Sequence, residues 1–263
     1  MKNEFEGPVS EWMVSPVFTT REETLLTEAA QRFDELGVSA LPVLDQSSRL
    51  IGVLSRDDLS RAGRMVARNE EGERHLRLPV ARVREFMHTR VPVIRRDLAL
   101  AACARRMLNQ DLRRLYVAED GPLEGVISTR EMLHAVANSQ LETALETIAD
   151  RSISVISGSD PLSVAMLKLR ASPGMTVVVM GSTAPVGVFA HQEATTSREA
   201  DPAEPVELWM DPNVLALPGE LPARRAAQRA HELQARYVII YEGQSARGIV
   251  SGLGFTELVA TSD

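Results

Sequence analysis

Four stretches of the chain share one pattern, in which a glycine opens a short apolar run that ends in polar residues. The glycines are Gly52, Gly125, Gly187 and Gly248. They are 73, 62 and 61 residues apart, so the chain follows a repeat of about sixty residues with extra length after the first unit. A period of this length is typical of proteins assembled from copies of one small structural unit.

The spacing of apolar residues predicts the elements of the first unit. After a short extended segment, apolar residues recur at helical spacing from Leu25 to Leu36, and Gly37 is placed to end that helix. Two apolar runs within residues 41–54, separated by a polar turn, predict a β-hairpin. A second helix then begins at Ser55. The order is strand, helix, strand, strand, helix.

The other three units repeat this order, so we expect an α+β fold of four β-α-β-β-α units. One three-stranded sheet alone would leave a face bare, so the units should pack in two pairs. The predicted boundaries are 1–77, 78–140, 141–200 and 201–263. Residues 61–77 are expected to prolong the second helix and then form a linker. Residues 135–149 are expected to form a helix that joins the two halves.

Composition places the chain among globular proteins, with 44% apolar and 25% charged residues. It holds no apolar run of the roughly 20 residues that a membrane helix needs, and no signal-peptide core. A single cysteine excludes an intrachain disulfide and a cysteine-based metal site, so we expect a cytoplasmic protein. The net charge of −7 argues against broad nucleic-acid binding.

The first repeat carries the strongest candidate for chemistry. Ser55 stands at the expected N-cap of the second helix, and Asp58 follows three residues later. A hydroxyl and a carboxylate beside the free amides of a helix start can hold a sugar hydroxyl and a phosphate together. Ser-x-x-Asp also resembles a capping box, which needs only a stable helix start. The pattern leaves both interpretations open, and they can coexist.

The sequence offers no catalytic constellation. The five histidines lie far apart, with no spacing that brings two onto one helical turn, so a metal site is not expected. Neither a glycine-rich phosphate loop nor a nucleophile elbow occurs. Cys103 lies in an apolar helical run and is interpreted as a core residue. We therefore expect neither enzyme activity nor a catalytic cofactor. Nucleotide hydrolysis at Asp58 or Glu131 is the one remote enzymatic route.

The stretches 37–45 and 50–59, which read GVSALPVLD and LIGVLSRDDL, resemble the cystathionine-β-synthase (CBS) domain family. The second unit matches from Phe86 to Met132, and the third and fourth match in order, spacing and apolar pattern. The resemblance implies four CBS motifs in two pseudo-two-fold pairs. It further implies a regulatory module that binds AMP, ADP, ATP or S-adenosylmethionine in clefts between paired motifs. In the family, the acid of the Ser/Thr-x-x-Asp element holds the ribose hydroxyls.

The resemblance implies several sets of ligand-binding residues. The first cleft would use Asp58, Ser55, Val91, Pro92, Arg113 and Arg114, of which Arg114 is the preferred phosphate ligand. The reciprocal cleft would use Ser128, Glu131, Val17, Val38, Ser39 and Ala40, although the family's usual acid is Asp rather than Glu. The second pair offers Glu193, Arg236 and Ser251. Because Ala190 lacks the hydroxyl and Gly254 the acid, a structural role is favoured for that pair.

We therefore expect an energy-sensing regulator that binds an adenosine nucleotide, forms a homodimer and signals to an unidentified protein. The alternative is a scaffold that assembles or dimerises without ligand. The ligand, the partner and the direction of control are left open, as is whether the four motifs close a disc within one chain or between two.

Overall fold

The computed structural model describes residues 4–67, 74–118 and 122–262. The first unit follows the predicted order, with the elements β1 (Thr20–Arg21), α1 (Leu26–Leu36), β2 (Ala40–Leu44), β3 (Leu50–Ser55) and α2 (Arg56–Ala62). The middle strand of its sheet is β2, which is parallel to β1 and antiparallel to β3. Gly37 ends α1 as predicted, with a φ of 62°, a conformation that glycine adopts without strain.

The other three units have the same five elements and the same strand order within each sheet. The second unit comprises β6 (Val93–Ile94), α3 (Leu100–Asn109), β7 (Arg114–Val117), β8 (Gly125–Ser128) and α4 (Thr129–Ala137). The third comprises β9 (Ser154–Ser157), α5 (Leu162–Ala171), β10 (Thr176–Met180), β11 (Pro185–Ala190) and α6 (His191–Thr196). The fourth comprises β12 (Val214–Leu217), α7 (Ala223–Glu232), β13 (Tyr237–Glu242), β14 (Ser245–Val250) and α8 (Gly252–Thr261).

A short 3₁₀ helix precedes each unit, at Val9–Glu11, Val83–Glu85, Leu145–Ile148 and Val206–Leu208. The segments that lead from these helices into the sheets cross between the members of each pair. The backbone of His88 pairs with Val53 in β3 before the chain enters the second sheet, and Val14 pairs likewise with Val126 in β8. The crossing ties the two units of a pair together and places each leading segment beside its neighbour's second helix.

Two predicted helical stretches are wrong. Residues 61–77 were expected to prolong α2 and then form a linker, but α2 ends at Ala62 and the chain forms two antiparallel strands, β4 (Arg64–Ala67) and β5 (Arg74–Arg77), with residues 68–73 outside the described part of the chain. The helix stops because Gly63 is extended and the chain beyond it pairs as a strand. The expected joining helix over 135–149 ends at Ala137, where the Ser139 hydroxyl donates to the carbonyl of Val136 (2.8 Å) and competes with helical hydrogen bonding.

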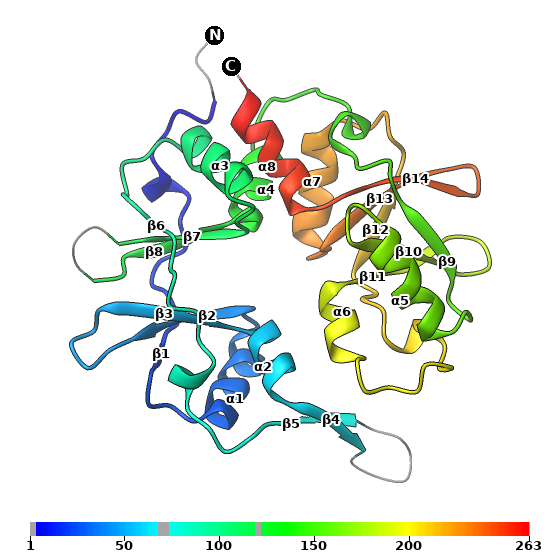
Figure 1. Ribbon diagram of the computed structural model, residues 1–263. Helices are drawn as coiled ribbons and strands as arrows, with labels where there is room; N and C mark the ends of the chain where they lie inside the picture. Colours follow the sequence, from blue (N-terminus) through cyan, green and yellow to red (C-terminus); the bar gives the residue numbers. More distant parts are fainter. Residues whose placement is uncertain (1–3, 68–73, 119–121, 263) are drawn as a thin grey trace.

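Figure 1 shows the four units in a ring, in the order first, second, fourth, third. The second and fourth units pack helix to helix, through α3 and α4 against α7 and α8. They share one apolar core, to which α7 contributes four buried alanines at helical spacing: Ala223, Ala226, Ala227 and Ala230. Small side chains let these helices approach closely. The first and third units have separate cores and meet mainly through α2 and α6.

Candidate functional site

The start of α2 forms the capping box that its sequence predicted. The Ser55 hydroxyl accepts a hydrogen bond from the Asp58 backbone N–H (3.2 Å). In return, one oxygen of Asp58, Oδ2, accepts from the Ser55 backbone N–H (2.8 Å) and from its hydroxyl (2.6 Å). The capping interpretation is therefore confirmed. It uses only one of the two carboxylate oxygens, which leaves the other for further contacts.

The second oxygen of Asp58 contacts two cationic or ionisable side chains. Oδ1 lies 2.5 Å from Arg61 Nη2 and 2.8 Å from His88 Nε2. The Asp58 side chain is only 4% exposed, whereas those of Arg61 and His88 are 53% and 62% exposed. A buried carboxylate thus lies beneath two outward-facing side chains, beside a groove of about 270 Å³ that Glu85 and Phe86 also line.

The contacts of Asp58 differ from those inferred from the sequence. The preferred arginine, Arg114, donates from Nη2 to the Ser39 hydroxyl (3.1 Å) and lies opposite Ser128 in the strand register. It therefore contacts residues of the reciprocal set. Val91 and Pro92 continue the leading segment beyond His88, and the Pro92 carbonyl accepts from the Tyr116 N–H. Arg113 has its carbonyl bonded to the N–H of Thr129.

Sequence reasoning missed the two side chains that contact the second oxygen of Asp58, Oδ1. Arg61 follows Asp58 by three residues, which places both on one face of α2, so helical spacing alone could have indicated this pair. No local signal points to His88, because its position depends on the crossing of the leading segment over β3.

The reciprocal site at the start of α4 repeats the arrangement with a longer acid. Glu131 Oε2 accepts from the Ser128 backbone N–H (2.7 Å) and its hydroxyl (2.6 Å). Among the described residues, none donates to the other carboxylate oxygen. The predicted companions of this site lie around the first sheet: Val17 in the leading segment, Val38 and Ser39 before β2, and Ala40 at its first residue.

The second pair places three charged residues at the corresponding positions. Glu193 occupies the place of Asp58 in α6, and Asp211 pairs with β11 as His88 pairs with β3. Arg236 enters from the fourth unit, and its Nη1 lies 3.1 Å from Glu193 Oε1 and 2.7 Å from Asp211 Oδ2. Glu193 and Asp211 are each 8% exposed. An ion triad of one half-buried arginine and two buried carboxylates therefore occupies the place of the groove seen in the first pair.

The fourth unit has no room for an acid at its helix start. A Cβ on Gly254 would lie 2.9 Å from the carbonyl oxygen of Ile148, because α8 packs directly against the 3₁₀ helix of residues 145–148. Ser251 is the N-cap of α8, but its side chain makes no capping hydrogen bond. The close backbone approach explains why the Ser-x-x-acid pattern is lost here.

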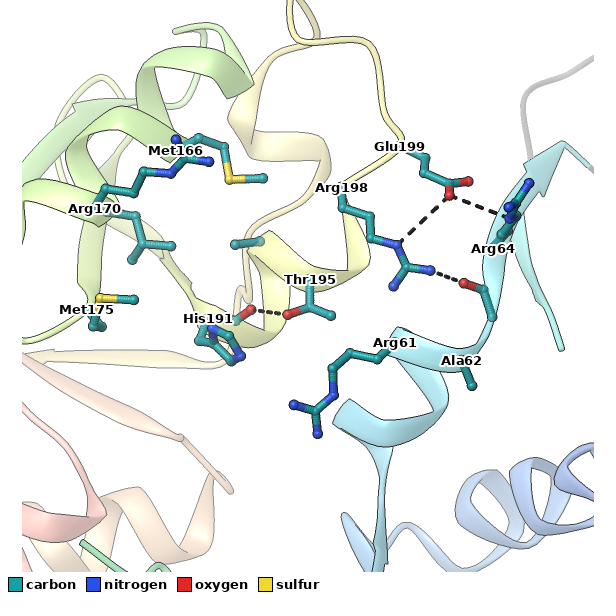
Figure 2. A pocket seen from close by; sticks show the side chains of 13 residues that line it. Arg61, Ala62, Arg64, Met166, Arg170, Met175, His191, Thr195, Arg198 and Glu199 are labelled. Atoms are coloured by element: carbon teal, nitrogen blue, oxygen red, sulfur yellow. Dashed lines mark hydrogen bonds and ion pairs between the residues drawn. The ribbon is translucent and has the colours of Figure 1, made fainter. Parts of the chain in front are cut away.

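A larger cavity of about 700 Å³ lies between the first and third units, and we name it the seam cavity (Figure 2). Among the described residues, four arginines line it: Arg61 in the last turn of α2, Arg64 at the start of β4, Arg170 at the end of α5, and Arg198 after α6. His191, Glu199 and the apolar side chains of Met166, Leu169 and Met175 complete its main walls. Arg61 borders both this cavity and the Asp58 groove.

Across the described part of the chain, no cluster of three or more His, Cys, Asp or Glu side chains could hold a metal ion. No helix of that part is long and apolar enough to cross a membrane. Two histidines that are distant in sequence nevertheless meet, since the rings of His134 and His231 stack at 4.8 Å between α4 and α7. No local pattern in the sequence predicts this contact, because it joins different units.

Comparison with known proteins identifies the repeat. The family model of the CBS domain matches residues 9–64 and 83–138. A relative from Methanocaldococcus jannaschii, the uncharacterised protein MJ1404, is 24% identical over 96% of this chain. The chain spans 62% of that relative's length.

Two solved structures share the whole fold at low identity. Protein MJ1225 from Methanocaldococcus jannaschii, proposed as an archaeal homologue of γ-AMPK, has a TM-score of 0.72 at 15% identity and covers 95% of this chain and 99% of its own. A conserved protein from Pyrococcus horikoshii has a TM-score of 0.63 at 18% identity, over 96% and 99% of the two chains. The first half of the chain is therefore identified as a tandem pair of CBS domains, and the second half repeats their fold.

Proposed function

We propose that the chain is a non-catalytic regulatory module that binds an adenosine-containing ligand in the cleft between its first two units. The observation that carries the proposal is the Asp58 carboxylate, which is buried, held in one orientation by Ser55 and adjacent to an open groove. A carboxylate fixed in this way is suited to accept both hydroxyls of a ribose.

Binding would exchange contacts at one oxygen only. The capping bonds on Oδ2 stay in place, while the ribose replaces Arg61 and His88 at Oδ1. Both displaced side chains are more than half exposed, so water compensates for much of the lost interaction. His88 belongs to the segment that enters the second unit, so its displacement offers a route by which the ligand changes how the pair is packed.

A thermal-shift panel of adenosine, AMP, ADP, ATP and S-adenosylmethionine tests the proposal. A ligand at about 100 times its Kd stabilises a protein by about 2.7 kcal/mol, which raises the Tm measurably. We expect at least one ligand to raise the Tm of the wild type and of Asp57→Asn, a neighbouring acid of the same helical turn, but not of Asp58→Asn. The absence of any shift at millimolar ligand would refute the proposal, as would an equal shift in both variants.

The second pair is better suited to a ligand-independent structural role. Its Arg236 triad occupies the corresponding cleft, and its α8 has no space for the ribose-binding acid. We propose that this half acts as the scaffold on which the first pair responds. The number of adenosine ligands bound per chain tests this structural role. One or two binding sites that are lost on substitution of Asp58 or Glu131 would support it, whereas a binding site that is lost in Glu193→Gln would contradict it.

A further inference from the structure

The ring has two seams between its halves, and they differ in chemistry. The seam between the second and fourth units is a continuous apolar core. It is packed so closely that a Cβ on Gly252 would lie 2.6 Å from the Thr129 hydroxyl oxygen. Among the described residues, the first and third units share no apolar core, and the seam between them contains the seam cavity instead. One side of the ring is thus joined by apolar packing and the other by polar contacts around a hollow.

Among the described residues, the hydrogen bonds across the seam between the first and third units come from one arginine. Arg198, which follows α6, donates hydrogen bonds to the carbonyls of Ser60 and Gly63 at the end of α2. These are carbonyls that a helix end leaves without an intrahelical partner. Glu199 lies at the outer limit of ion pairing, 3.9 Å from Arg64 and 4.0 Å from Arg198. A single carboxylate therefore serves two guanidinium groups.

The remaining charges of the cavity are unbalanced. Figure 2 shows Arg61 and Arg170 on opposite sides of the hollow, one from each half of the chain. Arg61 contacts Asp58, which lies outside the seam cavity. Among the described residues, the Arg170 side chain has no hydrogen-bond or ion-pair partner. Four arginines and one glutamate thus line a cavity in a chain whose net charge is −7.

We propose that the seam cavity binds a polyphosphate-bearing anion that contacts arginines of both halves and holds the open seam together. Guanidinium groups bind phosphate oxygens through paired, charge-assisted hydrogen bonds, and an anion between like charges removes their repulsion. The volume of about 700 Å³ lies within the range of small-molecule sites and exceeds what a single phosphate would fill. The inference goes beyond adenosine binding at Asp58 and does not depend on it.

The phosphates can belong to an inorganic chain or to a nucleotide, and titration calorimetry at constant ionic strength separates these sources. The ligands are sodium tripolyphosphate, adenosine and ATP. The variants are Arg170→Ala and, as a matched control, Arg229→Ala, which removes an exposed arginine from the last turn of the equivalent helix α7. Neither arginine side chain has a partner among the described residues, so both variants should fold as the wild type does.

We expect the affinity for tripolyphosphate to fall about tenfold in Arg170→Ala and to stay unchanged in Arg229→Ala, as the loss of one charge-assisted contact predicts. If the affinity for ATP depends on Arg170 while the affinities for tripolyphosphate and adenosine do not, the phosphates come from a nucleotide. Affinities for tripolyphosphate and ATP that are both independent of Arg170 would overturn the inference. Adenosine binding is measured separately with Asp58→Asn. A failure of the proposed adenosine function can therefore be told apart from a failure of anion binding in the seam cavity.

Hydrogen exchange tests the bridging role. Saturating anion should slow exchange of the amides of α2 and α6, the helices that meet at this seam, and leave α4 and α8 unchanged. If the anion binds but does not slow exchange in both helices, α2 and α6, it does not connect the two halves, and the bridging claim is overturned.

Discussion

The ion triad of the second pair allows a quantitative prediction for Arg236→Met. The substitution keeps the apolar stem but removes the charge that pairs with two carboxylates, each 8% exposed. Removing one partner of a buried ion pair costs about 3–5 kcal/mol, because the other charge stays buried. The Arg236 side chain is 34% exposed, so water reaches part of the site. We therefore expect a loss of about 2–3 kcal/mol in the free energy of unfolding at pH 7.

Urea unfolding followed by circular dichroism measures this loss, with Arg225→Met as the control. Arg225 is an exposed residue of α7 whose side chain has no partner among the described residues. The loss should shrink when Glu193→Gln is added, because the amide carries no charge to leave buried.

An Arg236→Met protein as stable as Arg225→Met would refute this reasoning. So would a loss of stability that Glu193→Gln does not reduce, because the cost would then come from packing rather than from unpaired charge. Either result would also remove the main support for a structural role of the second pair.

Three further predictions concern the helix starts and the core. Ser55→Ala should lower the free energy of unfolding by about 1 kcal/mol through loss of a cap, whereas Ser251→Ala, at an N-cap without a capping bond, should have little effect in the same urea assay. Gly254→Asp should lower the Tm and restore no ligand site, because its Cβ would meet the Ile148 carbonyl; a ligand-dependent Tm rise gained by this variant would contradict that. Burial raises the pKa of the Cys103 thiol to about 12, so it should resist a thiol reagent at pH 8 until urea is added, and rapid labelling of the native protein would disprove its burial.

Much of the fold could be predicted from the sequence because it rests on contacts between residues that are close in sequence. The helix end at Gly37 and the capping box at Ser55 each depend on residues within one or two turns of each other, and the sixty-residue repeat is the recurrence of such local patterns along the chain. The same locality misled where two states compete within a short stretch. The charged segment after α2 reads as helix, yet it pairs as the β4–β5 hairpin once Gly63 has ended the helix.

The site was predictable only in its local part. Sequence alone determined that Ser55 and Asp58 meet at a helix start, since a separation of three residues ensures it. Tertiary structure decided what surrounds them: His88 arrives through strand crossing, Arg114 contacts Ser39, and Arg236 closes the second cleft. These contacts join residues from different units, and a repeat pattern carries no information about how its copies are placed against one another. For the same reason, the apolar seam and the charged seam of the ring could be told apart only in three dimensions.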